Sequence, residues 1–303
     1  VSSYFCNRGR QKGKRTGKRP GINHDKKRRI SMTIGKLFAT ALTVLSLSAP
    51  AMAAQQVVIN GSTTVLPVVQ KAGESFMASH PDVELSISGG GSGNGIKALL
   101  EKQCDIAMSS RDIKDKEVDA AKKNGVTPNR VVVAIDAIVP VVNPANKVAA
   151  LTVEQLRDIF AGKITNWKDL GGEDAQIVAV SRDTSSGTFE SWEDLVMNKE
   201  RVSPKALMQA SNGAVVQTVS KNKNAIGYVG LGYVDKSTKP LKVNNVTADA
   251  ETAVSKQWPI ARELYIFTNG APKGVVKEFV DYLLAPDKGQ KDVREVGYVP
   301  LSK

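Results

Sequence analysis

The sequence predicts an α/β protein in which short strands alternate with helices. From residue 54 onward, β-branched runs such as 57–60, 83–88 and 225–229 alternate with amphipathic segments, a pattern typical of α/β folds. Three of the strand-to-helix junctions are rich in Gly, Ser and Thr. The 303 residues, of which 41% are hydrophobic and 24% charged, can build a sizeable core.

The elements are expected in the following order along the chain. Strands are predicted at 57–60, 83–88, 105–108, 131–135, 177–181, 225–229 and 264–268. Helices are predicted at 65–77, 96–103, 152–160, 188–197 and 275–284. Pro67 is tolerated in the first turn of the first helix, and Thr152 with Gln155 forms a capping box on the third. No repeat or low-complexity linker divides this part, so two lobes joined by strands fit better than two tethered domains.

The positive charge is concentrated at the N-terminal end. Residues 1–53 hold 12 Lys/Arg and one acidic residue, a balance of +11, whereas the whole chain carries +12. The remainder is therefore nearly neutral, and the charge says little about what the folded body binds. We expect no nucleic-acid partner.

This basic leader has two parts. Residues 1–31 have too few apolar side chains for a core, and we interpret them as a disordered basic extension. Three interpretations of this extension are open. It is a read-through upstream of a true start at Met32, an extended n-region of the signal peptide, or a basic arm that binds nucleic acid or membrane. Residues 32–53 match a secretory signal peptide, with cleavage predicted between Ala53 and Ala54. The expected location of the mature protein is the periplasm.

Cysteine and histidine are scarce after the leader. Cys104 is alone there, so no intramolecular disulfide is expected, and a small buried residue is the simplest interpretation. His80 is the one histidine in the same part of the chain. We expect no metal site and no cofactor.

Three loops have the composition of anion cradles. They are Gly61–Thr64, Ser88–Gly95 and Arg182–Thr188, and each opens a predicted helix. Free N–H groups, the helix dipole and hydroxyls can surround an oxyanion, although any one such loop alone is more often only a tight turn with an N-cap. The Arg182 guanidinium can bind two oxygens at once. Arg111 is a weaker candidate, which could instead pair with Asp112 or Asp115.

Motifs of enzymes do not fit these loops. The glycine-rich loop at 89–95 lacks the lysine of a nucleotide-binding P-loop. Ser92 and Ser186 lack the flanking glycines of a nucleophile elbow, since Asn94 and Thr184 stand in those places. We therefore expect a binding protein and not an enzyme, with an exported phosphate-ester hydrolase as the alternative.

Several motifs together resemble one family. The segments that carry the resemblance are 59–64, 91–93, 105–111, 156–167 and 182–188. With them, residues 54–303 resemble the periplasmic phosphate-binding component of ABC uptake systems. The resemblance implies a type II periplasmic-binding-protein fold, with the ligand in a cleft between two lobes and a hinge of two strands near 136–142 and 258–264. Lobe 1 would comprise residues 54–138 with 260–303, and lobe 2 residues 139–259.

The resemblance also implies a ligand, a partner and site residues. Inorganic phosphate would be captured by a monomer and delivered to an ABC permease at the inner membrane. The implied phosphate-binding residues, with the hydroxyl and arginine candidates from the loops, are Ser62, Thr63, Thr64, Ser92, Ser110, Arg111, Arg182, Ser186, Gly187 and Thr188.

One departure from the family affects ligand choice. Ser110 stands where the best-known members have an aspartate that accepts the proton of hydrogen phosphate, and Thr184 replaces a second aspartate, with Asp183 beside it. Alternatives therefore remain: another tetrahedral oxyanion such as sulfate or molybdate, or a phosphate sensor or scavenger without transport.

Overall fold

The structure of the protein is a computed structural model that describes residues 54–301. The interpretations of residues 1–31 and of the signal peptide at 32–53 fall outside the described residues. Residues 54–301 belong to one compact unit. Within this range, no helix combines the length and the apolar character needed to cross a membrane.

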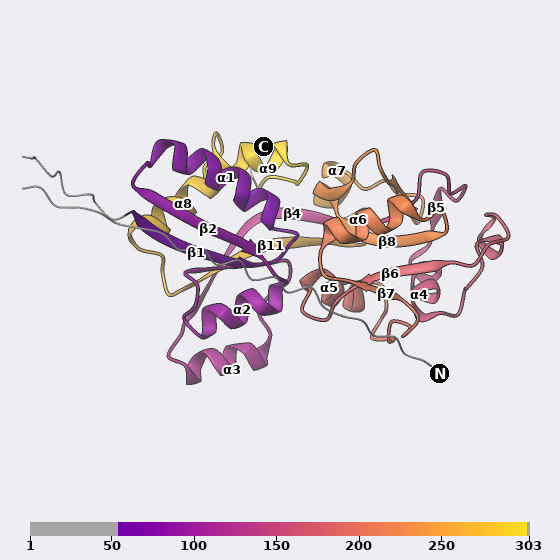
Figure 1. Ribbon diagram of the computed structural model, residues 1–303, viewed down its shortest axis with the longest axis horizontal. Helices are drawn as coiled ribbons and strands as arrows, with labels where there is room; N and C mark the ends of the chain where they lie inside the picture. Colours follow the sequence, from indigo (N-terminus) through magenta and orange to yellow (C-terminus); the bar gives the residue numbers. More distant parts are fainter. Residues whose placement is uncertain (1–53, 302–303) are drawn as a thin grey trace, which may run out of the picture. The chain divides into compact units, whose positions relative to one another are not determined.

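Eleven strands and two sheets form the framework of the described residues (Figure 1). The strands are β1 (Gln55–Gly61), β2 (Val83–Gly89), β3 (Ile106–Ser109), β4 (Pro128–Val142), β5 (Ala150–Leu151), β6 (Val178–Arg182), β7 (Leu207–Gln209), β8 (Ala225–Gly230), β9 (Lys239–Pro240), β10 (Lys242–Val243) and β11 (Ala261–Asn269).

Helices connect most of these strands. They are α1 (Leu66–Ser79), α2 (Ser92–Leu100), α3 (Asp115–Lys123), α4 (Val153–Ala161), α5 (Gly187–Leu195), α6 (Asn212–Lys221), α7 (Ala250–Val254), α8 (Gly274–Leu284) and α9 (Gly289–Glu295), with single 3₁₀ turns at Trp167–Leu170 and Leu231–Tyr233. The predicted α/β alternation is confirmed.

The large sheet has the strand order β2-β1-β3-β11-β4-β8-β6-β7, with β9 paired to β4. β1 is parallel to β2 and β3, and β6 is parallel to β7 and β8. Parallel neighbours bring their carboxyl ends to one edge, where loops that open helices can converge. β1, β2 and β3 therefore present the first two glycine-rich loops and Ser110 together, and β6 presents Arg182.

β4 and β11 run side by side through the middle of the sheet (Figure 1). Residues 128–137 of β4 pair antiparallel with β11, whereas residues 138–142 pair antiparallel with β8. The buried side chains of the two strands pass from one apolar cluster to another. Ala134 on β4 and Leu264 on β11 pack in one cluster. Ala137 on β4 and Ile260, just before β11, pack in the other. The change between Ile260 and Leu264 lies within the segment 258–264, and the change between Ala134 and Ala137 lies at the start of the segment 136–142.

The core around β1 and β11, which we call the first core, contains Ile59, Phe76 and Ile266. A separate apolar cluster that includes Ile96 and Phe267 packs beneath α2 and α3. Each fully buried side chain of this kind contributes roughly 1.5–3 kcal/mol to stability. The first core thus anchors β1, whose end carries the first loop.

The core around β6 and β8, which we call the second core, is built on stacked aromatic rings. The rings of Trp192 on α5 and Tyr228 on β8 are nearly parallel, with centroids 4.1 Å apart, and Phe160 meets Trp192 edge-on. The Tyr228 hydroxyl forms a 2.8 Å hydrogen bond with Ser181 Oγ. This stack therefore fixes α5 against β6, the two elements that carry the third loop.

Individual elements agree with the prediction to different degrees. The capping box of Thr152 and Gln155 on α4 is present as expected. α2 begins at Ser92, four residues before the predicted start, because the glycine-rich loop itself enters the helix. β4 continues seven residues beyond the predicted end at Ile135, and the buried Asp136 within it has an ionic partner on β11. α3 and α6 were not predicted.

Candidate functional site

Residues of the two cores meet where the first and third loops come together. The oxygens Thr64 Oγ1, after β1, and Thr188 Oγ1, on α5, lie 2.8 Å apart. Arg182 at the end of β6 reaches Thr63 Oγ1 with Nη2 at 3.3 Å. The hydroxyl cluster comprises seven buried residues: Ser62, Thr63, Thr64, Ser92, Ser110, Ser186 and Thr188.

Close backbone approach makes this cluster possible. A Cβ on Gly61, whose φ is +137°, would lie 2.1 Å from the carbonyl oxygen of Met108, so the first loop can rest on β3 only with glycine there. A Cβ on Gly187 would lie 2.4 Å from Ser92 Oγ and 2.8 Å from Ser110 Oγ. A side chain at position 187 would therefore fill the space beside two of the hydroxyls.

Backbone N–H groups orient two of the serine hydroxyls. Ser62 Oγ accepts hydrogen bonds from the N–H groups of Thr64 (3.1 Å) and Val65 (3.4 Å). Ser186, the N-cap of α5, likewise accepts two N–H groups, at 3.2 and 3.3 Å. A hydroxyl oxygen has two acceptor positions and one proton. Both serines therefore have only an O–H left to offer, which is what an oxyanion requires.

Thr63 is oriented in the same way by side chains. Its Oγ1 accepts hydrogen bonds from Arg182 Nη2 at 3.3 Å and from Asn212 Nδ2 at 3.2 Å. Asn212 also donates to Thr64 Oγ1 at 3.0 Å and accepts from the N–H of Gly230 through Oδ1. Asn212 is fully buried at the start of α6. Asn212 was not predicted from the sequence, since the N-cap residue Ser211 beside it indicates only a helix start and not the contact with the threonines.

Arg182 brings positive charge to the cluster. Its side chain is 1% exposed, with Nε 3.0 Å from the carbonyl oxygen of Gln209 and Nη2 3.1 Å from that of Ala210. Nη1 is buried and has no hydrogen-bond partner among residues 54–301. Burial lowers the pKa of Arg182, but an arginine remains charged in proteins. A buried guanidinium nitrogen without an acceptor favours binding of an anion.

Ser92 and Ser110 form the third side of the cluster. Ser92 Oγ accepts the N–H of Ser110 at 3.0 Å and lies 3.3 Å from Ser110 Oγ. Ser191, on α5, donates its hydroxyl to the carbonyl oxygen of Ser110 at 3.3 Å. This bond joins the end of β3 to α5, so Ser110 lies at the junction of the two cores.

Arg111 lies outside this cluster. Its two terminal nitrogens donate to the two carboxylate oxygens of Glu117, both at 2.8 Å. Its Nε lies 2.6 Å from Glu190 Oε2, on α5. Neither Asp112 nor Asp115 supplies the ionic partner that the alternative interpretation expected, since the Asp112 carboxylate pairs with Arg130. Because two carboxylates already bind this guanidinium, we leave Arg111 out of the candidate anion site.

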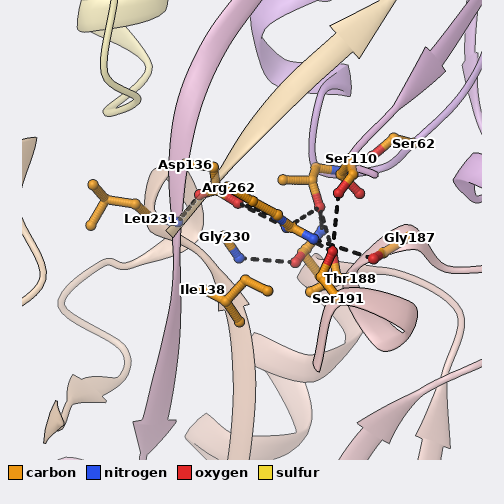
Figure 2. Close-up of polar contacts among 12 residues, drawn as sticks. Ser62, Ser110, Asp136, Ile138, Gly187, Thr188, Ser191, Gly230, Leu231 and Arg262 are labelled. Atoms are coloured by element: carbon orange, nitrogen blue, oxygen red, sulfur yellow. Dashed lines mark hydrogen bonds and ion pairs between the residues drawn. The ribbon is translucent and has the colours of Figure 1, made fainter. Parts of the chain in front are cut away.

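A second arginine, Arg262, reaches the cluster from β11. Its guanidinium lies between Asp136 and the Gly187–Thr188 turn (Figure 2), with Nη2 2.8 Å from Asp136 Oδ2 and 2.9 Å from Thr188 Oγ1. Burial raises the pKa of Asp136, an effect opposed by Arg262 and by the N–H of Leu231. The sequence analysis missed this pair because only the pairing of β4 with β11 brings the two residues together.

The geometry therefore describes a candidate oxyanion site lined by oriented hydroxyls and two guanidinium groups. Within residues 54–301, no group of three His, Cys, Asp or Glu side chains lies close enough to hold a metal ion.

Comparison with known proteins places the chain in a family. The model of the PBP superfamily domain matches residues 48–287. The phosphate-binding protein PstS of Bacillus subtilis is 31% identical over 248 residues, which are 80% of this chain and 80% of that protein. The chain belongs to the PBP superfamily and, within it, to the PstS family.

Solved structures related to the PstS family share the architecture. A Clostridium perfringens protein with bound phosphate has a TM-score of 0.76 at 35% identity, covering 82% of this chain and 100% of its own. An ABC-type phosphate transport receptor from Vibrio cholerae has a TM-score of 0.66 at 33% identity, covering 80% of this chain and 99% of its own. The predicted type II periplasmic-binding-protein fold and the family resemblance are thereby confirmed.

Proposed function

We propose that this protein captures inorganic phosphate and delivers it to an ABC permease. The relatives named phosphate-binding protein PstS support the ligand, and the Vibrio cholerae phosphate transport receptor supports the transport role. The observation that carries the proposal is the buried Nη1 of Arg182, which has no hydrogen-bond partner in the described part of the chain and lies beside a hydroxyl whose oxygen already accepts two N–H groups.

The proposed phosphate site surrounds the anion with donors from both cores. Arg182 supplies charge, and the hydroxyls and the N–H groups of the loops supply the remaining donors. The residues that we assign to it are Ser62, Thr63, Thr64, Ser92, Ser110, Arg182, Ser186, Gly187 and Thr188.

Entry of the ligand requires the two cores to separate, because the side chains of the hydroxyl cluster are all buried. We propose that residues 54–138 with 260–303 form one lobe and residues 139–259 the other. The strands β4 and β11, which pass from one core to the other, would serve as the hinge.

The proposed location is the periplasm, reached through the signal peptide at 32–53 with cleavage between Ala53 and Ala54. We propose a monomer that binds its ligand without catalysis and without a cofactor. Sulfate is the second candidate ligand, and the observation that favours it is Ser110, which offers a neutral hydroxyl where a carboxylate would repel a fully deprotonated anion.

Replacement of Arg182 tests the proposal. Isothermal titration of the purified full chain with inorganic phosphate is expected to show one site, and Arg182→Ala is expected to weaken binding by about 30-fold or more, since losing one partner of a buried charged contact costs about 2–5 kcal/mol. Arg182→Lys, which retains charge but not the planar fork, is expected to be intermediate.

Arg157→Ala is the matched control. Arg157 is a partly buried arginine of the second core's helix α4, and its partners are Asp158 and Glu200. It is expected to leave the phosphate dissociation constant unchanged. An unsubstituted chain that takes up no phosphate would refute the proposed function, and a folded Arg182→Ala variant with full affinity would refute the assigned site.

A further inference from the structure

The pair Arg262–Asp136 joins the two strands that pass between the cores. Arg262 and Asp136 are register partners on β11 and β4. Their side chains are 6% and 0% exposed. Asp136 Oδ2 accepts Arg262 Nε at 2.9 Å and Nη2 at 2.8 Å, and Oδ1 accepts the N–H of Leu231. The carboxylate thus binds Nε and one N–H of Nη2, which leaves the second N–H of Nη2 and those of Nη1 free to donate.

These remaining N–H groups of Arg262 face the first and third loops (Figure 2). Nη2 donates to Thr188 Oγ1 at 2.9 Å and lies 3.5 Å from Thr64 Oγ1, and Nη1 lies 3.4 Å from the carbonyl oxygen of Gly187. Arg262 is therefore the one described side chain that contacts both of these threonine hydroxyls and also belongs to a crossing strand.

These contacts decide which way the threonine hydroxyls can act. Two hydroxyls have two protons and four acceptor positions. One proton joins Thr64 to Thr188 and occupies one acceptor position. Asn212 donates to Thr64, and the Nη2 hydrogen of Arg262 that Asp136 does not bind donates to Thr188 at 2.9 Å, with only a 3.5 Å contact to Thr64. One proton is left over for the ligand, against one acceptor position that the 3.5 Å contact partly covers. The threonine pair is therefore better placed to donate a hydrogen bond to an anion than to accept one.

We propose that Arg262, held in place by Asp136, is a positioning residue of the anion site that fixes the Thr64 and Thr188 hydroxyls as donors. This inference rests on the proposed function. Arg262 adds a second positive charge beside the ligand, and because it stands on β11 it makes the donor arrangement depend on the closed packing of β11 against the third loop.

A purely structural ion pair would also join β4 to β11, so the test must separate the two roles. A double-mutant cycle does so, because residues that act through one another give losses that do not multiply. One arm is the paired replacement Asp136→Asn with Arg262→Gln, which removes both charges and leaves neither buried alone. The other arm is Thr188→Val, which removes only the hydroxyl.

The measurement is isothermal titration of the full chain with inorganic phosphate, with thermal unfolding recorded for every variant. We expect each arm to weaken phosphate binding by about tenfold or more. The combined variant should bind phosphate about as tightly as the single arm that has the larger loss. The control is the paired replacement Asp112→Asn with Arg130→Gln, a half-exposed ion pair that also involves β4 and should leave affinity unchanged.

The possible outcomes separate the inference from the function on which it rests. No binding by the unsubstituted chain would remove the proposed function itself. If the unsubstituted chain binds phosphate, unchanged affinity in the paired variant, or losses that multiply in the combined variant, would overturn the role of Arg262. Should the paired variant not fold, Arg262→Lys replaces it: a severalfold loss that disappears in the Thr188→Val background supports the inference, and unchanged affinity overturns it.

Discussion

At the end of β3, Ser110 offers the ligand an oxygen whose acceptor positions are not all used. Its Oγ lies 3.3 Å from Ser92 Oγ, and no other hydrogen bond to it occurs within residues 54–301. Ser62, Thr63 and Ser186 differ, since their oxygens each accept two N–H groups. In the proposed site, Ser110 is therefore the hydroxyl best able to receive the proton of hydrogen phosphate, and as a neutral group it would not repel sulfate.

A carboxylate at this position should sharpen ligand choice. In Ser110→Asp, a protonated phosphate can donate to the new carboxylate, whereas sulfate has no proton to give and meets a like charge. We expect the ratio of sulfate to phosphate dissociation constants to rise by about tenfold or more, because an unpaired or repelled buried group costs about 1–3 kcal/mol. Competition of the two anions in isothermal titration measures this ratio.

Ser110→Asn is the matched control for that substitution. It adds an amide of nearly the same size without a charge, so it should weaken both anions without favouring phosphate. Equal shifts of the sulfate-to-phosphate ratio in the Asp and Asn variants would mean that Ser110 does not contact the protonated oxygen.

Among the secondary-structure elements, α5 connects the two cores through charge as well as through the site. Glu190 on α5 lies 2.6 Å from Arg111 Nε and 2.5 Å from Lys114 Nζ, both from the side of the first core. The Arg111 and Glu190 side chains are 9% and 12% exposed, so this contact is shielded from solvent. Separation of the cores would break it, and it should therefore slow opening.

Removal of that contact should speed release of the ligand. We expect Glu190→Gln to raise the phosphate dissociation rate about threefold to tenfold, with a smaller change in the association rate, since the contact forms only when the cores meet. Stopped-flow tryptophan fluorescence can measure both rates. Glu193→Gln, on the same helix, is the control, and equal dissociation rates in the two variants would contradict the role of Glu190.

The elements also show how far the sequence could predict the structure. Strand and helix types were predictable where apolar periodicity was strong, as in β2 and α8. α3 was missed because its segment is mostly charged and only Ala121 is fully buried. The end of β4 was missed because Asp136 and Pro140 interrupt the apolar run, and only pairing with β11 and β8 compensates for them.

The three loops were predictable for a local reason, because hydroxyls and glycines at helix starts leave a pattern along the chain. Asn212 and Arg262 were not predictable in this way. They join the site through strand order and register, and neither has a neighbouring motif that names its partner. Arg111 shows the converse: its position beside Ser110 suggested ligand binding, whereas in the structure its guanidinium pairs with Glu117, six residues along the chain, and with Glu190 on α5.

Over the whole molecule, the sheet order places the ends of β1, β2, β3 and β6 around one point between two cores. The first core holds three of these strands, and the aromatic stack of the second holds β6 and α5. Donors that are spread over more than a hundred residues of sequence thereby meet, and a buried guanidinium nitrogen is left facing them. This convergence of donors is what suits the site to an oxyanion.

A crystal structure of the full chain grown with inorganic phosphate would show whether these donors meet at one anion. We predict one phosphate within hydrogen-bonding distance of Arg182 Nη1 and of the hydroxyls of Thr63, Ser110 and Thr188, which would be about 2.6–3.2 Å for each contact. A fully occupied phosphate bound elsewhere, with Arg182 Nη1 still lacking an acceptor, would contradict the account.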